Sequence, residues 1–257
     1  MNTYEHTDPA KVKVIFEPQV IEANKPAYFV ISVTEDGKNV PLEVVHTMKM
    51  HLLVVNEELT WFDHIHPEKQ ADGTYYVSET FPSAGKYLFF IDYKPVGLPA
   101  NVNMKLVGVQ GRQLRQRPER DEKLISDVDG YTVTLLNGND LKTNMEQSLQ
   151  FSIEKEGKIL KEKDIETYLG ANAHIVMISQ QDKDFLHIHP MSDHRFPIYA
   201  ETYIRKSGLY RMWVQFKIDG KVHTADFTVL TCEGERGEGG DINHGAHHQM
   251  NSAGQKI

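Results

Sequence analysis

Residues 50–67 read MHLLVVNEELTWFDHIHP, and residues 173–190 read AHIVMISQQDKDFLHIHP. Both stretches end in His-Ile-His-Pro, and each carries a further histidine 13 residues before the first histidine of that phrase. The histidines are His51, His64 and His66 in the first copy and His174, His187 and His189 in the second. One offset of 123 residues relates the two sets, and it also carries Phe62 onto Phe185, Gly85 onto Gly208 and Tyr87 onto Tyr210. A repeat of this length is a duplicated domain rather than a solenoid unit.

The composition bounds the class of protein. With 40% hydrophobic and 25% charged residues over 257 positions, the chain has the make-up of a globular protein with two domains of ordinary size. A formal net charge of −8 argues against nucleic acid and anionic membranes as partners, because both require basic patches. The single cysteine, Cys232, excludes an internal disulfide framework and a thiolate-rich metal site.

The sequence contains no recognisable targeting segment. No apolar run approaches the roughly 20 residues that span a bilayer, so we expect no membrane insertion. The start, residues 1–6, reads MNTYEH and lacks the basic and apolar regions of a secretory signal. As written, the chain is predicted to be cytoplasmic. A trimmed export segment would place it in the cell envelope or outside the cell.

Short apolar alternations separated by turn signals predict an all-β protein. In the first half, clusters of Gly, Pro, Asn and Asp divide seven or so alternating segments at intervals of about 8–12 residues, and no helical period is evident. This pattern is typical of an antiparallel β-sandwich, and the second half repeats it. We therefore predict two tandem sandwiches, at 11–110 and 128–232, joined by a linker at 111–127. A loose start at 1–10 and a disordered His- and Gly-rich tail at 233–257 complete the predicted organisation.

A hairpin would bring the three histidines of each copy to one face of a sheet. His64 and His66 are two apart on a predicted strand, so their side chains share a face. If residues 56–59 form a four-residue loop, His51 lies directly opposite His64 and diagonal to His66. The inference depends on loop parity, because an odd loop turns His51 to the other face. The same reasoning applies to the second copy.

Three converging imidazoles with an open fourth position form a site that suits copper, zinc or nickel better than magnesium or calcium. We therefore predict one metal site per domain, for copper, zinc or another divalent transition metal. The predicted ligands are His51, His64 and His66 in the first domain and His174, His187 and His189 in the second. The alternative is that these are buried structural histidines whose ring nitrogens bond backbone carbonyls or tyrosines. Duplication copies structural features as faithfully as functional ones, so both interpretations stay open.

The sequence also resembles a known family. The segment WFDHIHP at 61–67 follows Met50-His51-Leu52 and precedes the turn FPSAGKY at 81–87. These motifs are similar to those of the bacterial YtkA-like domains, which are immunoglobulin- or cupredoxin-like sandwiches found in cell-envelope proteins and beside heavy-metal handling systems. The resemblance covers both repeats and implies such a sandwich and a role in metal or copper traffic. The chain departs from it in having no signal or lipid-anchor segment and no Cys of a blue-copper site, since Cys232 lies after the last predicted strand.

Three classes of function follow from these observations. The first, which we predict, is a non-enzymatic metal-binding protein. The second is a metal-free binding or adaptor protein that presents sandwich loops or edges to a protein partner. A metalloenzyme comes last, because no acid or base recurs in both copies: Leu186 stands where Asp63 does. Cupins also begin a metal motif with His-x-His, but here no downstream histidine completes their set.

Overall fold

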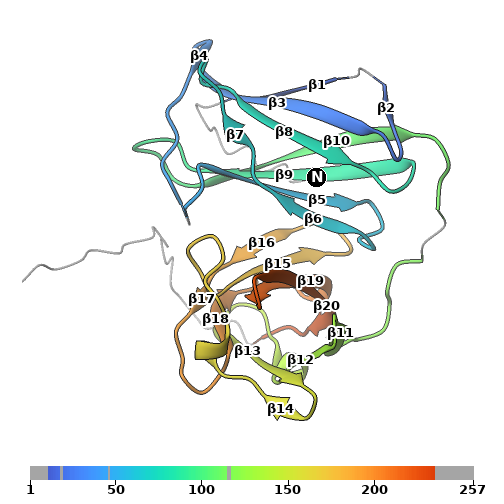
Figure 1. The fold of residues 1–257 in the computed structure, drawn as a ribbon, viewed down its shortest axis with the longest axis vertical. Helices are drawn as coiled ribbons and strands as arrows, with labels where there is room; N and C mark the ends of the chain where they lie inside the picture. The colour runs from blue at the N-terminus through green and yellow to red at the C-terminus, as the bar shows by residue number, and fades with distance from the viewer. Residues whose placement is uncertain (1–10, 18–19, 46, 115–116, 235–257) are drawn as a thin grey trace, which may run out of the picture.

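The computed structural model describes residues 11–17, 20–45, 47–114 and 117–234, and almost every element in them is a β-strand (Figure 1). The strands form two sandwiches of two sheets each, one for each sequence repeat. The helical elements of the described ranges are two single 3-10 turns, Gly138–Asp140 and Glu162–Asp164, and no helix there could cross a bilayer. The prediction of two tandem β-sandwiches is confirmed. The predicted loose start and nearly all of the predicted tail lie outside the described residues.

The first domain has an outer sheet and an inner sheet, and the inner sheet faces the second domain (Figure 1). The outer sheet has the strand order β1-β3-β8-β7, with β4 paired to β3, and the inner sheet has the order β2-β10-β9-β5-β6. The bounds are β1 Lys11–Glu17, β2 Ile21–Glu22, β3 Pro26–Glu35, β4 Lys38–Asn39, β5 Met50–Asn56, β6 Phe62–Ile65, β7 Glu68–Lys69, β8 Tyr75–Thr80, β9 Gly85–Tyr93 and β10 Asn101–Gln110.

The second domain repeats this arrangement. Its outer sheet has the order β11-β12-β13-β18-β17, with β14 paired to β13, and its inner sheet has the order β16-β15-β19-β20. The bounds are β11 Ile125–Val128, β12 Tyr131–Leu135, β13 Glu146–Lys155, β14 Lys158–Ile159, β15 Ala173–Ser179, β16 Phe185–Ile188, β17 Pro190–Met191, β18 Ile198–Tyr203, β19 Gly208–Ile218 and β20 Lys221–Thr231. Strand β12 therefore takes the place of β1, and β13 to β20 follow the order of β3 to β10.

One strand of the second domain lies where the sequence predicts a linker. β11 overlaps the end of the stretch 111–127 and pairs with β12. Just before it, Lys123 pairs through its backbone with Thr228 on β20. The second domain thus begins near residue 123, and the predicted boundary at 128 is wrong. With Ile125 and Val128 as its only apolar residues, β11 is too short to give a recognisable alternation.

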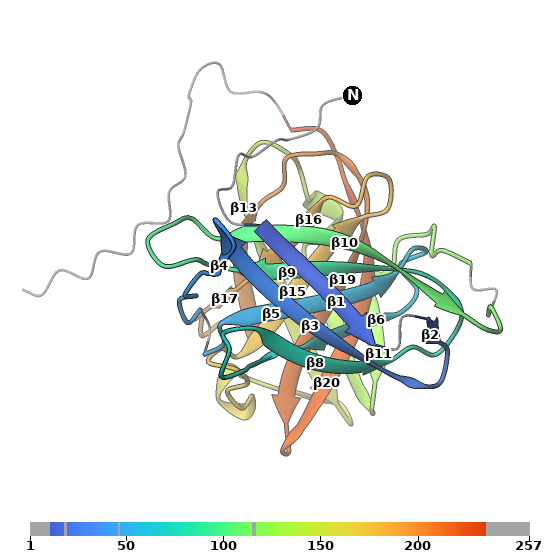
Figure 2. The same ribbon diagram turned by 90° about the horizontal axis from the view of Figure 1, so that it is seen from above.

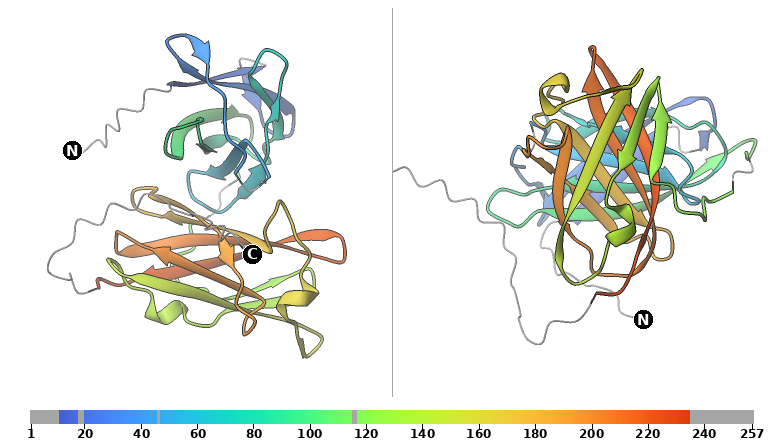
Figure 3. Two further views of the ribbon diagram at one scale, coloured as in Figure 1. Left: turned by 90° about the vertical axis from the view of Figure 1, so that its left-hand side faces the viewer. Right: turned by 90° about the horizontal axis from the view of Figure 1, so that it is seen from below.

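The two domains stack through their inner sheets, so the molecule has four layers of sheet (Figures 1 and 3). Burial alternates along the outer strands β3 and β13, which have only one face on a core. By contrast, β5 and β15 are buried at every residue. A strand is buried on both faces only where further layers cover both sides of its sheet. Here the other domain supplies the second cover, and β5 and β9 lie over β15 and β19 when the molecule is seen from above (Figure 2).

A separate apolar cluster fills the contact between the inner sheets. Its members are Leu53, Val55, Leu59, Leu88, Phe90, Val176, Ile178 and Trp213, with Phe62 and Phe185 packed against them. Phe62 stacks on Trp213 with ring centroids 4.8 Å apart, and Phe185 stacks on Phe90 at 4.6 Å. The repeat offset carries Phe62 onto Phe185 and Phe90 onto Trp213. The two stacks are therefore copies of one contact, as in an isologous dimer interface around a two-fold axis.

The hairpin of β5 and β6 has a longer loop than the sequence predicts. Leu53 pairs with His64, so the loop spans residues 56–61 and the predicted pairing of His51 with His64 is wrong. Asn56 accounts for the length, because its Oδ1 accepts hydrogen bonds from two backbone N–H groups at the far end of the loop, at 2.8 and 2.9 Å. Six residues, like four, keep the parity, so His51 and His64 still share a face. The hairpin of β15 and β16 has the matching register.

Candidate metal centre between the two domains

The six histidines lie where the inner sheets of the two domains meet. His51 and His174 lie near the start of β5 and β15, His64 and His187 lie on β6 and β16, and His66 and His189 directly follow those two strands. The hairpin parity turns them all toward the other domain. His51, His64 and His174 are each at most 5% exposed, so the cluster is part of the molecular interior.

Within the first repeat, two rings converge on one nitrogen of the third. His51 Nδ1 lies 3.2 Å from His64 Nε2 and 3.2 Å from His66 Nε2. The ring centroids of His64 and His66 are 4.5 Å apart, and those of His187 and His189 in the second repeat are also 4.5 Å apart. The structure thus brings together the three histidines that the sequence groups in each repeat.

The two sets of three lie against each other across the domain interface. The His51 ring centroid lies 5.2 Å from that of His187 in the other domain, and the His64 centroid lies 5.5 Å from that of His174. Candidate ligand nitrogens of His51, His64 and His187 lie within 4.8 Å of one another, as do those of His174, His187 and His189. The six histidines therefore form one cluster that both domains build, and the predicted site of one three-histidine set per domain stays a prediction, since one candidate set is the predicted second-domain triad.

Two of the rings are oriented by backbone carbonyls. His51 Nε2 lies 3.2 Å from the carbonyl oxygen of Val45, and His174 Nε2 lies 3.1 Å from that of Tyr168. A carbonyl oxygen only accepts, so each neutral ring carries its hydrogen on Nε2 and its lone pair on Nδ1. Val45 and Tyr168 are again 123 residues apart. The repeat thus reproduces both the histidine and the group that fixes its tautomer.

Two more rings are oriented across the domain interface. His187 Nδ1 donates to Asp92 Oδ2 at 2.7 Å, and His64 Nδ1 donates to Gln215 Oε1 at 2.9 Å. Asp92 on β9 and Gln215 on β19 are also 123 residues apart, so each domain orients a histidine of the other from the same strand position. Both bonds leave Nε2 as the nitrogen that points into the cluster. Histidines that bind metal ions are held by outward bonds of this kind to carboxylates and carbonyls.

Burial holds two rings of the cluster, His64 and His66, in the neutral form. It places the pKa of His64 well below the ordinary value of 6.5, and the neighbouring His66 and His187 add to the effect. Burial, followed by the charges of His51 and His174, lowers the pKa of His66 to about 3. Water no longer stabilises the positive ring, and nearby rings repel one another when charged. The lone pairs of His64 and His66 are therefore present at neutral pH, and neutral imidazole is the form that binds metals.

The residues that orient the rings were not predicted from the sequence. Asp92 pairs with His51 across β5 and β9, and Gln215 pairs with His174 across β15 and β19. The repeat offset could have connected these two polar positions, although one is a carboxylate and the other an amide. Val45 and Tyr168 act through their backbone, so no side-chain pattern marks them.

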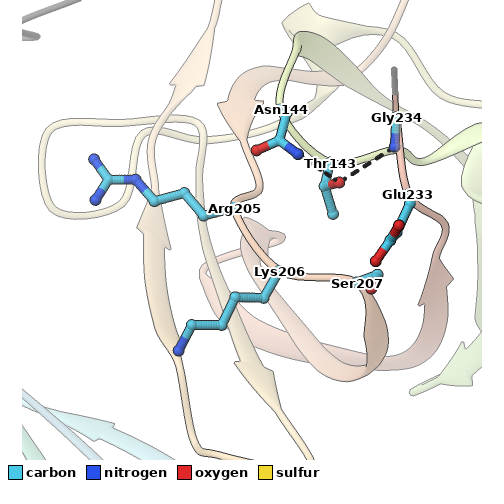
Figure 4. Close-up of a pocket in the computed structure, with 7 residues that line it drawn as sticks. All are labelled: Thr143, Asn144, Arg205, Lys206, Ser207, Glu233 and Gly234. Carbon is cyan, nitrogen blue, oxygen red and sulfur yellow. Dashed lines mark hydrogen bonds between the residues drawn. The ribbon is translucent and has the colours of Figure 1, made fainter. Parts of the chain in front are cut away.

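A surface pocket on the second domain lies apart from the cluster (Figure 4). It has a volume of about 330 Å³ and is lined by Thr143, Asn144, Arg205, Lys206, Ser207, Glu233 and Gly234. Ser207, directly before β19, precedes Gln215 by eight residues. At the rise of about 3.3 Å per residue in a strand, this separates the two residues by about 26 Å. The Arg205 and Lys206 side chains extend away from the pocket, and Lys206 Nζ donates to Asp182. The pocket therefore has no part in the histidine site.

Comparison with protein families identifies the repeated unit. A family described as "Domain of unknown function (DUF8832)" matches residues 5–107 and again residues 126–233. The chain belongs to this family. The second match begins within β11. The resemblance to YtkA-like domains is not confirmed by these matches and stays a prediction.

Several solved structures also match the chain. The fibronectin(III)-like modules of Clostridium thermocellum CbhA match at 14% identity over 92% of this chain and 100% of that one, with a TM-score of 0.25. The Escherichia coli adhesin FdeC matches at 10% identity over 87% and 66%, with a TM-score of 0.30, and the Yersinia pseudotuberculosis adhesin InvE at 12% over 85% and 58%, with 0.26. The chain thus spans about two thirds or less of the two adhesin chains. Likeness at this level carries no argument about what this DUF8832 protein binds. No curated protein matches the chain.

Proposed function

We propose that this DUF8832 protein binds a divalent transition-metal ion, copper or zinc, through the histidine cluster between its domains. In this proposal the protein holds the ion and performs no catalysis on it. The donor set consists of imidazoles without a thiolate, which suits zinc, copper(II) and nickel and disfavours magnesium and calcium.

The observation that carries the proposal is the outward hydrogen bond of four of the rings. Two end on backbone carbonyls and two on side chains of the opposite domain, and all four leave the remaining nitrogen pointing into the cluster. A buried histidine that serves only packing needs one partner, but nothing in packing requires four rings to aim their remaining nitrogens at a common space. A metal ion does require it.

The spacing of the ring nitrogens supports the same proposal. His51 Nδ1 is 3.2 Å from His64 Nε2. Nitrogens bound to one tetrahedral ion at 2.0–2.1 Å lie about 3.3 Å apart. This pair of nitrogens therefore already has the spacing of two ligands of one ion.

Metal titration of the full chain tests the proposal. Protein purified without a His-tag and stripped with EDTA is titrated with Zn(II) and Cu(II), and the bound metal is counted after gel filtration. We expect stoichiometric binding that His187→Ala removes. His194→Ala is the matched control, because His194 is 94% exposed and lies outside the cluster, and it is expected to bind as the wild type does. Absence of binding, or equal loss in both variants, would contradict the proposal.

A second candidate function has its own supporting observation. β10 has β9 on one side. On its other side, within the described residues, it pairs only with the short β2, at Val109 and Gln110, so most of this edge of the sheet is open. Along this edge Val102, Met104 and Leu106 are 40–60% exposed. An open edge with apolar side chains can accept a strand from a partner protein. In this alternative the protein is a metal-free binding module with structural histidines, and adding Zn(II) or Cu(II) leaves its melting temperature unchanged.

A further inference from the structure

We infer that the two domains share a single tetrahedral zinc centre, with His51 and His64 from the first domain and His174 and His187 from the second as its four ligands. The inference rests on the proposed function and goes beyond it by naming the ligands, the ion and the number of ions per chain. It replaces a three-histidine site in each domain by one site that neither domain builds alone.

The donor nitrogens of His51, His64 and His187 lie within 4.8 Å of one another, and those of His174 and His187 fall in a second such set with His189, so the His174 ring has to move toward the first three to complete the centre. All six distances between the ring centroids of the four proposed ligands lie between 5.2 and 6.1 Å. Four imidazoles bound to one ion at 2.0–2.1 Å have centroids about 5.2 Å apart in a regular tetrahedron. In a square plane the diagonal distances exceed the edges about 1.4-fold, whereas here the longest distance is only about 1.2 times the shortest. The arrangement therefore fits tetrahedral zinc better than tetragonal copper(II).

Each ring presents a defined nitrogen to the proposed centre. Backbone carbonyls leave Nδ1 of His51 and His174 as the inward nitrogen, and the cross-domain bonds leave Nε2 of His64 and His187. In the neutral rings both His51 Nδ1 and His64 Nε2 carry lone pairs, and these atoms lie 3.2 Å apart. Lone pairs at this distance repel each other unless a cation lies between them. A zinc ion at the centre turns this repulsion into coordination.

The pseudo-two-fold axis explains why the ligands divide two and two. The repeat offset exchanges His51 with His174 and His64 with His187, so the four ligands obey the symmetry of the aromatic stacks beside them. A single ion that two equivalent domains share must lie close to that axis. Each domain then supplies one ligand from its fully buried strand and one from the neighbouring hairpin strand.

His66 and His189 flank this centre. The His66 centroid lies 5.1 Å from that of His51, and the His189 centroid lies 6.3 Å from that of His174, each within its own domain. His189 also belongs to a candidate set with His174 and His187. Once the four central rings complete a tetrahedron, no coordination position is left for the flanking two. They line the site instead.

The test uses the full chain, stripped of metal and reloaded with Zn(II), or with Co(II) as a spectroscopic probe of geometry. We expect one ion per chain and the intense visible bands of tetrahedral Co(II). Each of the variants His51→Gln, His64→Gln, His174→Gln and His187→Gln is expected to weaken binding more than about a hundredfold, beyond the effect typical of residues outside the ligand shell. His66→Gln and His189→Gln are matched controls within the same cluster, expected to keep one ion with affinity within about tenfold of the wild type.

The possible outcomes separate the inference from the proposed function. Two ions per chain, with His64→Gln and His187→Gln each removing one, overturn the shared centre and leave metal binding intact. Octahedral Co(II) bands, or loss of the ion in His66→Gln or His189→Gln, overturn the ligand set. Failure to bind either ion overturns both proposals. Circular dichroism checks the fold of each variant, and the stoichiometry and Co(II) spectrum of the wild type decide the matter even where a variant does not fold.

Discussion

Lowering the pH of the metal-free protein tests whether the cluster is buried in its neutral form. The folded-state pKa values of His64 and His66 lie below the ordinary value of 6.5, so the unfolded chain takes up protons first as the pH falls. The stability that these two groups contribute is complete above about pH 6.5 and is lost as the pH drops from there toward the folded-state values. These two histidines are therefore expected to make the metal-free protein less stable at pH 5 than at pH 7.

The size of the effect follows from the pKa values. For His66, a folded-state pKa of about 3 gives a loss of about 2 kcal/mol in the free energy of unfolding between pH 7 and pH 5. His64 adds to this loss, because burial lowers its pKa as well. Glu79 acts in the opposite direction, because burial and the nearby Asp63 raise its pKa from 4.5 to about 7. Its raised pKa makes the protein less stable as the pH rises through this range, so acidification from pH 7 to pH 5 restores about 2 kcal/mol.

The opposite effects of the two histidines and of Glu79 on stability can be separated with variants. Between pH 7 and pH 5, Glu79→Gln is expected to lose about 2 kcal/mol more of its free energy of unfolding than the wild type, and adding His66→Gln is expected to cancel that extra loss. Urea unfolding in EDTA at both pH values measures these differences. His194→Gln changes a 94% exposed histidine and is expected to behave as the wild type. If Glu79→Gln is equally stable at both pH values, the neutral buried cluster is refuted.

Two further predictions concern contacts across the interface. Asp92→Ala removes the acceptor of His187 Nδ1–H and is expected to weaken Zn(II) binding by about 10–100-fold, whereas Asp92→Asn keeps an acceptor oxygen and loses less; isothermal titration that finds equal affinity for Asp92→Ala and the wild type would contradict this role. Phe62→Ala removes one ring of the interdomain stack and is expected to lower the free energy of unfolding by about 2–3 kcal/mol and to extend the molecule in small-angle scattering. The control Tyr76→Ala removes an exposed ring of the outer sheet, so an equal effect there would show that the stack has no special part.

The fold was largely predictable because its signals are local. Alternation along β3 and β13 and the Gly-, Asp- and Asn-containing turns set strand and loop positions, and the repeat set the number of domains. The misplaced boundary near residue 123 has a different cause. There the chain that precedes the second repeat pairs with β12 and β20, and pairing partners far apart in sequence leave no mark on a strand this short.

The grouping of the histidines was predictable because side-chain direction in a hairpin depends only on the parity of its loop. The predicted four-residue loop and the observed six-residue loop both keep His51 and His64 on one face. The residue opposite His64 differs by two positions, since it is Leu53 rather than His51. The loop length itself depends on the Asn56 side chain, which binds backbone groups at the far end of the loop. A side-chain contact of that kind follows from the folded geometry and not from hydrophobic periodicity.

The sharing of the site between domains was harder to foresee, yet the sequence held part of it. The runs Leu52–Val55 and Ile175–Ile178 are apolar without alternation, and such strands are covered on both faces. Their lack of alternation indicates cover on both faces, which places His51 and His174, on the same strands, beside a second layer. When two copies of a domain pack through equivalent surfaces, residues near the axis meet their own copies. His64 and His187 do so with ring centroids 5.7 Å apart. A histidine set near the axis of a duplicated pair is therefore doubled by symmetry, and its donors have to be counted over both domains before its metal chemistry can be assigned.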